Sequence, residues 1–180
     1  MKWYTEPSNW KATPEGIELE THGKTDFWRI THDNGDRHNG HFYFDEYRGN
    51  HVISVRVEGG FKDLYDQAGL MIRIDKENWI KCGIEYMNGV HHRSCVVTRG
   101  PSDWSILPDD VGPSVWIRLA RNGHTVEVSF SSDGKDWRLH RQTFFPAADP
   151  VEIGFMAASP SGGGFPVRFS HFTDDATARA

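Results

Sequence analysis

The sequence predicts an all-β protein, a jelly-roll β-sandwich of two antiparallel sheets, and three observations lead to this fold class. Apolar and polar residues alternate in short runs, which is the two-residue period of β-strands. Turn-forming residues separate the runs about every 8 to 12 residues. Aromatic residues make up 13% of the chain and glycine 18 of its 180 residues, as is typical of strands joined by tight turns. No segment shows the 3.6-residue period of an amphipathic helix.

The length and charge of the chain restrict its class. At 180 residues we expect one domain over residues 1–180, with residues 175–180 as a frayed tail. The net charge of −5 and the lack of a Lys/Arg run predict no binding to nucleic acid or to a membrane. The chain has neither the apolar core of a signal peptide nor a stretch of about 20 apolar residues. We therefore expect a soluble, cytoplasmic protein.

In chain order, residues 1–14 form a polar lead-in, and strands are expected over residues 16–21, 25–31, 41–44 and 51–58. Residues 32–40 read HDNGDRHNG, a loop without helical pattern that we expect to be mobile and to border a site. Within residues 51–58, Ile53, Val55 and Val57 share one face. Further strands are expected over residues 69–74 and 79–86, with Leu70, Ile72, Ile80 and Cys82 among the core-facing residues.

Asn88-Gly89 is the strongest hairpin signal in the chain, because a type I′ turn requires positive φ at both central positions. A two-residue loop there places Cys82 opposite Cys95, Ile80 opposite Val97, Lys81 opposite Val96 and Glu85 opposite His92. Two buried free thiols are the simplest interpretation of the cysteines. A cross-strand disulfide remains the alternative.

Residues 115–139 predict a three-stranded meander with turns at Asn122-Gly123 and Asp133-Gly134. Two-residue loops pair Leu119 with Val126, Ile117 with Val128 and Val115 with Phe130, then Phe130 with Trp137 and Val128 with Leu139. All of these pairs are apolar, so we assign Trp137 to the core. The last strands are expected over residues 151–155 and from Val167, with a flexible loop at residues 159–164 between them.

Residues 63–105 form the stretch whose polar residues the fold does not explain. One face of its strands is apolar, whereas the other carries Arg73, Lys81 and Glu85. Flat aromatic rings, among them Tyr65, accompany these hydrogen-bonding groups. This mixture favours a site for a polar, ring-shaped ligand.

The same stretch carries a family resemblance. The run YDQAGLMIR from Tyr65, the run WIKCGIE from Trp79, and the later segments VVT and SDWS resemble the regulation-of-enolase-like family of uncharacterised proteins. The segments TDFW from Thr25 and SSDGKDW from Ser131 are similar to further parts of that pattern. The resemblance covers nearly the whole chain and places it in the concanavalin A-like lectin/glucanase superfamily. It implies a two-sheet jelly roll whose concave sheet face binds or cleaves sugars in relatives, and it implies no particular activity.

The residues that we predict to bind a ligand are polar or aromatic and lie off the expected core face or in adjoining loops. They are Trp28, His41, Asp66, Gln67, Arg73, Trp79, Lys81, Glu85, Thr98, Asp103, Trp104, Trp116 and Arg118.

Carbohydrate binding by a small sugar or sugar derivative is the leading functional hypothesis. Arg73, Lys81 and Arg118 would suit a phosphorylated or acidic ligand. The alternatives are a glycosidase-like enzyme and a regulatory protein-interaction module of carbohydrate metabolism. Hydrolysis needs two carboxyl groups, and the candidates are Glu85 with Asp66 or Asp103, although the usual two-carboxylate strand motif of glucanases on this fold is absent.

No cofactor or metal is predicted. The ten histidines lack zinc-site spacing, and no glycine-rich loop joins a strand to a helix as nucleotide binding would require. A protein partner and a homodimer stay open.

Overall fold

The protein, described here by a computed structural model over residues 1–107 and 109–176, consists of two seven-stranded antiparallel sheets and a small two-stranded hairpin. Sheet A comprises, in spatial order, β1 (Lys2–Trp3), β6 (His41–Tyr47), β15 (Val151–Ala158), β8 (Gln67–Arg73), β9 (Asn78–Met87), β10 (Val90–Arg99) and β11 (Ser102–Leu107). Sheet B comprises β14 (Arg138–Phe144), β13 (Thr125–Ser131), β12 (Ser114–Asn122), β7 (His51–Gly59), β16 (Pro166–Asp175), β3 (Gly16–Glu20) and β2 (Asn9–Thr13).

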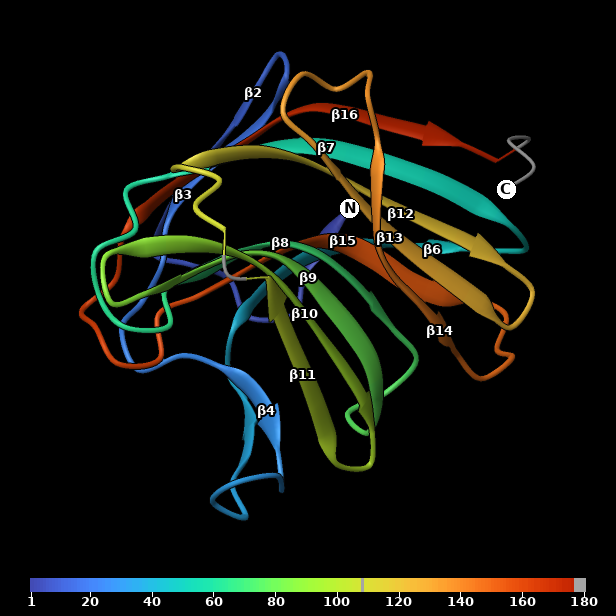
Figure 1. Ribbon diagram of the computed structural model, residues 1–180, viewed down its shortest axis with the longest axis horizontal. Coiled ribbons are helices and arrows are strands. Elements are labelled where there is room, and N and C mark those ends of the chain that lie inside the picture. Colours follow the sequence, from blue (N-terminus) through green and yellow to red (C-terminus); the bar gives the residue numbers. More distant parts are fainter. Residues whose placement is uncertain (108, 177–180) are drawn as a thin grey trace.

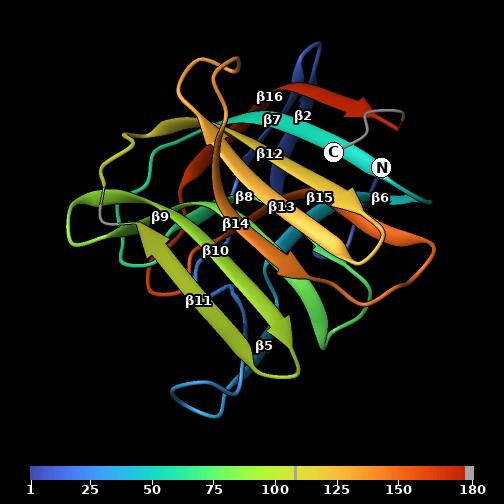
Figure 2. The same cartoon turned by 45° about the vertical axis from the view of Figure 1, so that its right-hand side comes forward.

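The two sheets pack face to face, and the hairpin β4 (Phe27–Arg29) with β5 (Asp36–His38) lies below sheet A in Figure 1, on the side away from sheet B. Figure 2 shows the same two layers after rotation. The described residues form no helix, and hence none that could cross a bilayer. This arrangement confirms the predicted all-β sandwich.

The main core lies between the sheets and comes from the apolar faces that the alternation predicts. Ile53, Val55 and Val57 of β7 are fully buried there. From sheet A, Leu70, Ile72, Ile80, Cys82, Cys95 and Val97 face them. Because strand side chains alternate between faces, the residues between these positions lie on the outer face of sheet A.

A second apolar cluster covers part of that outer face. Phe27 of the hairpin packs there against Phe42, Met71 and Trp79, and all four side chains are almost completely buried. The Phe27 and Trp79 rings meet edge to face with centroids 6.2 Å apart. Sheet A therefore buries apolar residues on both faces, which explains the continuous burial of β8 and β9.

The Asn88-Gly89 turn is confirmed, with φ of 52° at Asn88 and 87° at Gly89. It sets the expected register, so that Cys82 pairs with Cys95 and Glu85 with His92. Both cysteines are free and buried.

The predicted pairing of the 115–139 meander is wrong in both of its turns. Gly123 and His124 form the first loop, so Leu119 pairs with Val128 and Ile117 with Phe130. This shift of two residues keeps the same face buried, because the side-chain period of a strand is two.

The second turn is a longer loop, and a bulge follows it, so Phe130 pairs with Arg138 rather than Trp137 and Val128 with Arg141 rather than Leu139. Leu139 is 60% exposed. Trp137 lies under the Arg118 guanidinium, 4.6 Å from the ring centroid, outside the core to which its predicted pairing assigned it.

The two segments predicted as irregular contain short strands. The lead-in forms β1 and β2, and its Trp3 and Trp10 rings pack 5.4 Å apart. The HDNGDRHNG segment contributes β5 to the hairpin. Strand β16 runs through Asp175, the first residue of the predicted tail, and residues 177–180 lie outside the described part of the chain.

Two paired glycines leave a bare patch of backbone on the outer face of sheet A. Gly69 of β8 stands opposite Gly83 of β9. A Cβ on Gly69 would lie 1.9 Å from the Cys82 carbonyl oxygen, and one on Gly83 would lie 2.0 Å from that of Ala68. The strand backbones approach too closely on this face for any side chain, so the sheet has an open floor there.

Replacement of Gly83 by alanine should therefore destabilise the protein by about 2 kcal/mol or more, because backbone rather than a flexible side chain must move. Gly163→Ala is the matched control, since nothing lies within 4 Å of its added Cβ, and it should change stability by less than about 0.5 kcal/mol. Urea unfolding of both variants measures the difference. Equal stabilities would show that the close backbone approach does not require glycine.

Candidate ligand-binding site

The hairpin covers only part of the outer face of sheet A, and a small polar hollow lies beside it. Gln67, Lys81, Cys82, Gly83, Ile84, Glu85, Ser94 and Met156 line this hollow, which we call the Glu85 hollow. Its cavity volume is about 10 Å³, close to the space that one water molecule occupies. Met156 and Gly83 line it together with the polar side chains.

Lys81 occupies the side of the hollow nearest the hairpin. Its side chain is almost fully buried, and its Nζ donates hydrogen bonds to the Phe27 carbonyl oxygen (2.7 Å) and to Asp26 Oδ1 (3.3 Å). Asp26 Oδ2 in turn accepts a bond from Arg37 Nε at 3.2 Å. Charges buried in this way are stable only when they are paired and hydrogen-bonded, so the hairpin supplies the partners that Lys81 needs.

Glu85 occupies the opposite side and is 6% exposed. Its Oε2 accepts hydrogen bonds from Ser94 Oγ (2.6 Å) and Trp104 Nε1 (2.9 Å). The same indole N–H lies 3.1 Å from Ser94 Oγ. Two side chains, one from β10 and one from β11, therefore hold the carboxyl group in one orientation.

The burial of Glu85 raises its pKa, because removal from water disfavours the charged carboxylate. The Lys81 ammonium and the bond from Ser94 lower the pKa, while the Asp26 carboxylate raises it and the Trp104 bond lowers it. Burial dominates, so the pKa stays above the ordinary value. Such a shift in a concave polar site is a feature of functional carboxyl groups.

Two aromatic rings stand at the rim. Trp104 is 38% exposed and Tyr65 is 37% exposed, and their centroids lie 6.3 Å apart with the rings nearly perpendicular. Tyr65 has a φ of 68°, an uncommon conformation for a bulky residue. The rim thus offers flat apolar surfaces next to buried hydrogen-bonding groups.

Four of the predicted site residues meet at the hollow, namely Gln67, Lys81, Glu85 and Trp104. The two other carboxyl candidates do not join them. Asp66 is fully buried, and its oxygens accept bonds from Ser159 Oγ and from the backbone N–H groups of Lys62 and Asp63. Asp103 pairs with Arg141 of sheet B, on the opposite side of its strand from Trp104.

Other predicted residues lie on the same sheet or hairpin but away from the hollow. Trp79 belongs to the second apolar cluster, and Trp28 packs against it and bonds to the Thr31 carbonyl. Thr98 is buried and shares a bond with Ser102. Arg73 pairs with Glu152 and stacks over the Tyr4 ring, 4.6 Å from its centroid.

His41, also predicted as a site residue, is fully buried and lies against the N-terminal segment of the chain. Its Nε2 accepts a bond from the His22 N–H, and its Nδ1 lies 2.9 Å from the Thr5 carbonyl oxygen. Burial lowers the pKa of His41, which fits a neutral ring that holds two loops together. Among residues 1–107 and 109–176, no three His, Cys, Asp or Glu side chains gather as a metal site.

Trp116 and Arg118 lie on the outer face of sheet B, on the far side of the molecule from the hollow. Trp116 packs against His171, with centroids 5.2 Å apart, and against Gly134 of the SSDGKDW loop. Arg118 stacks on Trp137. The sequence places them off the core face but cannot say on which sheet.

The sequence prediction missed Ser94 and Asp26 as members of the site. Ser94 could have been found, because the register set by the Asn88-Gly89 turn pairs it with Gly83. Asp26 carries no such signal, since it reaches Lys81 only through the packing of the hairpin.

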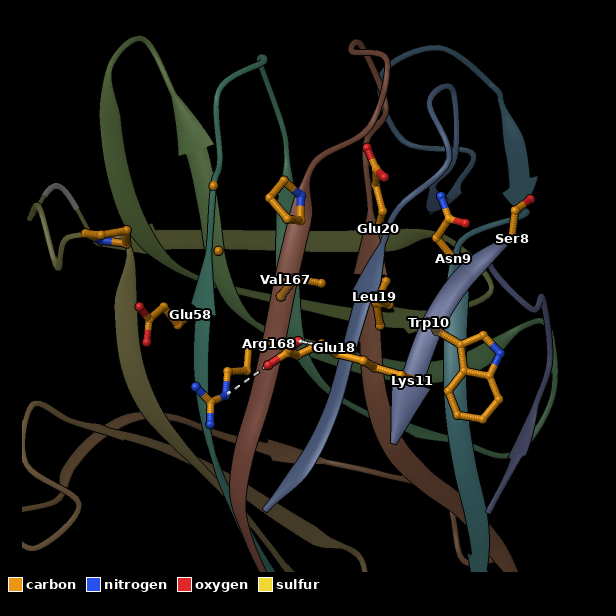
Figure 3. A pocket seen from close by; sticks show the side chains of 14 residues that line it. Ser8, Asn9, Trp10, Lys11, Glu18, Leu19, Glu20, Glu58, Val167 and Arg168 are labelled. Carbon is orange, nitrogen blue, oxygen red and sulfur yellow. Dashed lines mark ion pairs between the residues drawn. The ribbon is translucent and has the colours of Figure 1, made fainter. Parts of the chain in front are cut away.

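A larger groove lies on the outer face of sheet B, over β2, β3, β16 and β7, with a cavity volume of about 760 Å³ (Figure 3). Most of its charged side chains form ion pairs: Lys11 and Arg168 both contact Glu18, Arg168 also contacts Glu15, and Glu58 contacts Arg56. Exposed pairs of this kind contribute little and leave no buried polar group for a ligand. The chemistry of the smaller hollow makes it the better candidate site.

The stability of Glu85→Gln should depend on pH differently from that of the wild type. Below the unfolded-state pKa the carboxyl is protonated in both the folded and the unfolded state, so its ionisation does not lower the stability of the protein. As pH rises, the unfolded state releases this proton first, so the wild type loses stability until the raised folded-state pKa is passed. The glutamine variant lacks this loss and keeps the acceptor for Ser94 and Trp104. It should therefore gain stability relative to the wild type as the pH rises from about 4 towards neutrality.

Urea unfolding of the wild type and of Glu85→Gln across this pH range measures the effect. Glu127→Gln, on the outer face of sheet B beside Gln142, is the control and should follow the wild-type curve. A constant difference between wild type and Glu85→Gln at every pH would contradict the raised pKa.

Similar proteins share this fold over the whole chain. A Saccharomyces cerevisiae protein named Regulation of enolase protein 1 is 38% identical over 172 residues, which cover 95% of this chain and 87% of that protein. A crystal structure of a functionally unknown S. cerevisiae protein is 37% identical, covers 99% of this chain and 97% of its own, and gives a TM-score of 0.95.

A more distant structure shows the fold alone. Carbohydrate binding module CBM66 from Bacillus subtilis is 14% identical, with a TM-score of 0.58 over 96% of this chain and 94% of its own. The jelly-roll sandwich is therefore the fold of a known carbohydrate-binding module. Residues 3–176 match the family described as Protein of unknown function (DUF1349), and with the close yeast relative this shows that the chain belongs to that family.

Proposed function

We propose that the protein binds a small carbohydrate on the outer face of sheet A, at the Glu85 hollow. The observation that carries this proposal is the Glu85 carboxyl, buried and oriented by Ser94 and Trp104 beneath an exposed aromatic rim. Sugars are recognised by hydrogen bonds to their hydroxyl groups and by contact of their apolar C–H faces with aromatic rings. The hollow supplies both kinds of contact within one small area.

The Glu85 carboxyl does not stabilise the fold. A buried charge costs stability unless it is fully paired, and the raised pKa of Glu85 shows that its partners do not cancel the cost of burial. Residues that lower the stability of the folded protein are expected mainly at functional sites. The same argument does not apply to Lys81, whose bonds to the hairpin hold two parts of the fold together.

The arrangement supports binding rather than hydrolysis. Glycosidases need two carboxyl groups on opposite sides of the scissile bond. Asp66 and Asp103 are committed to loop and inter-sheet contacts. Asp26 is tied to Lys81, Arg37 and the Phe27 N–H. Glu85 is therefore the carboxyl left to contact a ligand.

A second candidate function is docking of a protein partner on the same face. The yeast relative is named for regulation of enolase, and Leu64, Tyr65 and Trp104 are exposed at the rim, with relative accessibilities of 41%, 37% and 38%. Exposed apolar groups next to a polar site can mark a protein contact. Co-purification of the protein with enolase, compared between the wild type and Leu64→Ser, tests this function separately.

A screen of monosaccharides by thermal shift tests carbohydrate binding. A ligand at 100 times its Kd should add about 2.7 kcal/mol, which is a rise of roughly 5 to 10 °C in Tm for a domain of this size. Trp104→Ala should weaken the binding of any hit at least about tenfold, because it removes a rim ring and a bond to Glu85.

Trp137→Ala is the matched control, since this ring lies on the outer face of sheet B, and it should bind as the wild type does. The proposal is abandoned if no sugar raises the Tm of the wild type. Equal loss of binding in both tryptophan variants would place the ligand elsewhere.

A further inference from the structure

Two side-chain oxygens of the Glu85 hollow have no hydrogen-bond donor among the described residues. Glu85 Oε2 takes both bonds to that carboxyl from the described residues, which leaves Oε1 without a donor. Gln67 donates through Nε2 to the Tyr65 carbonyl oxygen at 3.2 Å, and no described group donates to its Oε1. Two acceptor oxygens from neighbouring strands, in register with each other, therefore remain for a ligand.

Two donor hydrogens also remain, one on Lys81 and one on Gln67, whose amide nitrogen uses one of its two N–H groups for the Tyr65 carbonyl. The Lys81 ammonium has three N–H groups, and two of them bond to Asp26 and the Phe27 carbonyl. The third is unassigned among the described residues. A group that both donates and accepts, as a hydroxyl does, can satisfy this combination.

The size of the hollow limits what can enter it. About 10 Å³ of space holds one water molecule or one hydroxyl group but not a sugar ring. The ring must then stay outside, at the level of the exposed Trp104 and Tyr65 side chains. Ligand binding would exchange one water for one hydroxyl group.

The cations near the hollow are already paired. Lys81 contacts Asp26, Arg37 contacts Asp26 and Asp33, and Arg73 contacts Glu152. Arg118 lies on the other sheet. An anionic group would meet the free oxygens of Glu85 and Gln67, and the cation beside them, Lys81, already has its charge neutralised by Asp26. Repulsion between like charges therefore disfavours an anionic group there.

We infer that the Glu85 hollow selects neutral sugars over anionic ones by admitting a single hydroxyl group, which donates a hydrogen bond to Glu85 Oε1. This inference rests on the proposed carbohydrate site and names its ligand class. It excludes the phosphorylated or acidic sugar that the Arg and Lys residues of the sequence suggest. Specificity of this kind arises from the acceptor that rejects the wrong ligand as much as from the contact that binds the right one.

Titration calorimetry with matched sugars tests the inference. The neutral probes are glucose, galactose, mannose and xylose, and their anionic counterparts are glucose 6-phosphate, glucuronate and galacturonate. We expect at least one neutral sugar to bind at least tenfold more tightly than its anionic counterpart. Single deoxy derivatives of that sugar should show one position whose loss reduces affinity at least tenfold, while the other positions matter less.

Glu85→Gln places an N–H group where Oε1 stood and leaves the bonds from Ser94 and Trp104 intact. This variant should bind the neutral sugar at least tenfold more weakly, and its affinities for the neutral and the anionic sugar should become similar. Glu127→Gln, on sheet B, is the control and should keep the wild-type preference. Unfolding curves for both variants show that each is folded.

The outcomes separate the inference from the proposed function. Anionic sugars that bind the wild type as tightly as neutral ones, or tighter, overturn the inference and leave carbohydrate binding intact. A neutral sugar that binds Glu85→Gln with unchanged affinity and preference also overturns it, since Glu85 is then not the selecting group. If no probe of either class binds, the proposed function fails and the inference fails with it.

Discussion

The buried Lys81 ammonium is the interaction on which the outer face of sheet A depends. Strand alternation sends this side chain away from the main core, where water would ordinarily receive it. Instead the β4–β5 hairpin covers it, and Asp26 and the Phe27 carbonyl accept its hydrogen bonds. The same hairpin inserts Phe27 beside Trp79 and Met71. One ion pair and one aromatic ring therefore cover part of a sheet face that a two-layer sandwich leaves open.

The candidate site exists because that cover is incomplete. On the outer face of sheet A, Gly83 and then Glu85 follow Lys81 along β9. Ser94 and Trp104 hold the Glu85 carboxyl by hydrogen bonds. Glycine keeps the floor low because the β8 and β9 backbones approach too closely for a side chain. Burial without full compensation raises the Glu85 pKa. A carboxyl in this state lowers the stability of the protein and leaves an oxygen available to a ligand. Functional sites commonly lower stability in this way.

Size and chemistry point to different surfaces of this molecule. The groove over β2, β3, β16 and β7 is far larger than the hollow, yet most of its charged side chains form exposed ion pairs at the surface. The hollow is small, but Glu85 Oε1 and Gln67 Oε1 there accept no hydrogen bond from a described residue. Because unmet hydrogen bonds in a concave site drive recognition more strongly than open volume does, the hollow carries the functional argument. The shared fold with a carbohydrate-binding module is consistent with that choice.

The sequence alone determined most of the longer strands, their core faces and the register of β9 with β10, because these depend on local information. It missed the short strands β1, β2 and β5. A period of two marks which residues share a face, and the Asn88-Gly89 turn sets the pairing of Cys82 with Cys95. At the next two hairpins the same rule misplaced the first loop by one residue and made the second loop too short. It therefore predicted Leu139 and Trp137 as core residues, whereas both lie outside the core. Only the tertiary structure decided which outer face is covered and which is open. It buried Trp79, separated Arg118 from Glu85 and brought Asp26 to Lys81, since alternation cannot say which distant segment packs on a face.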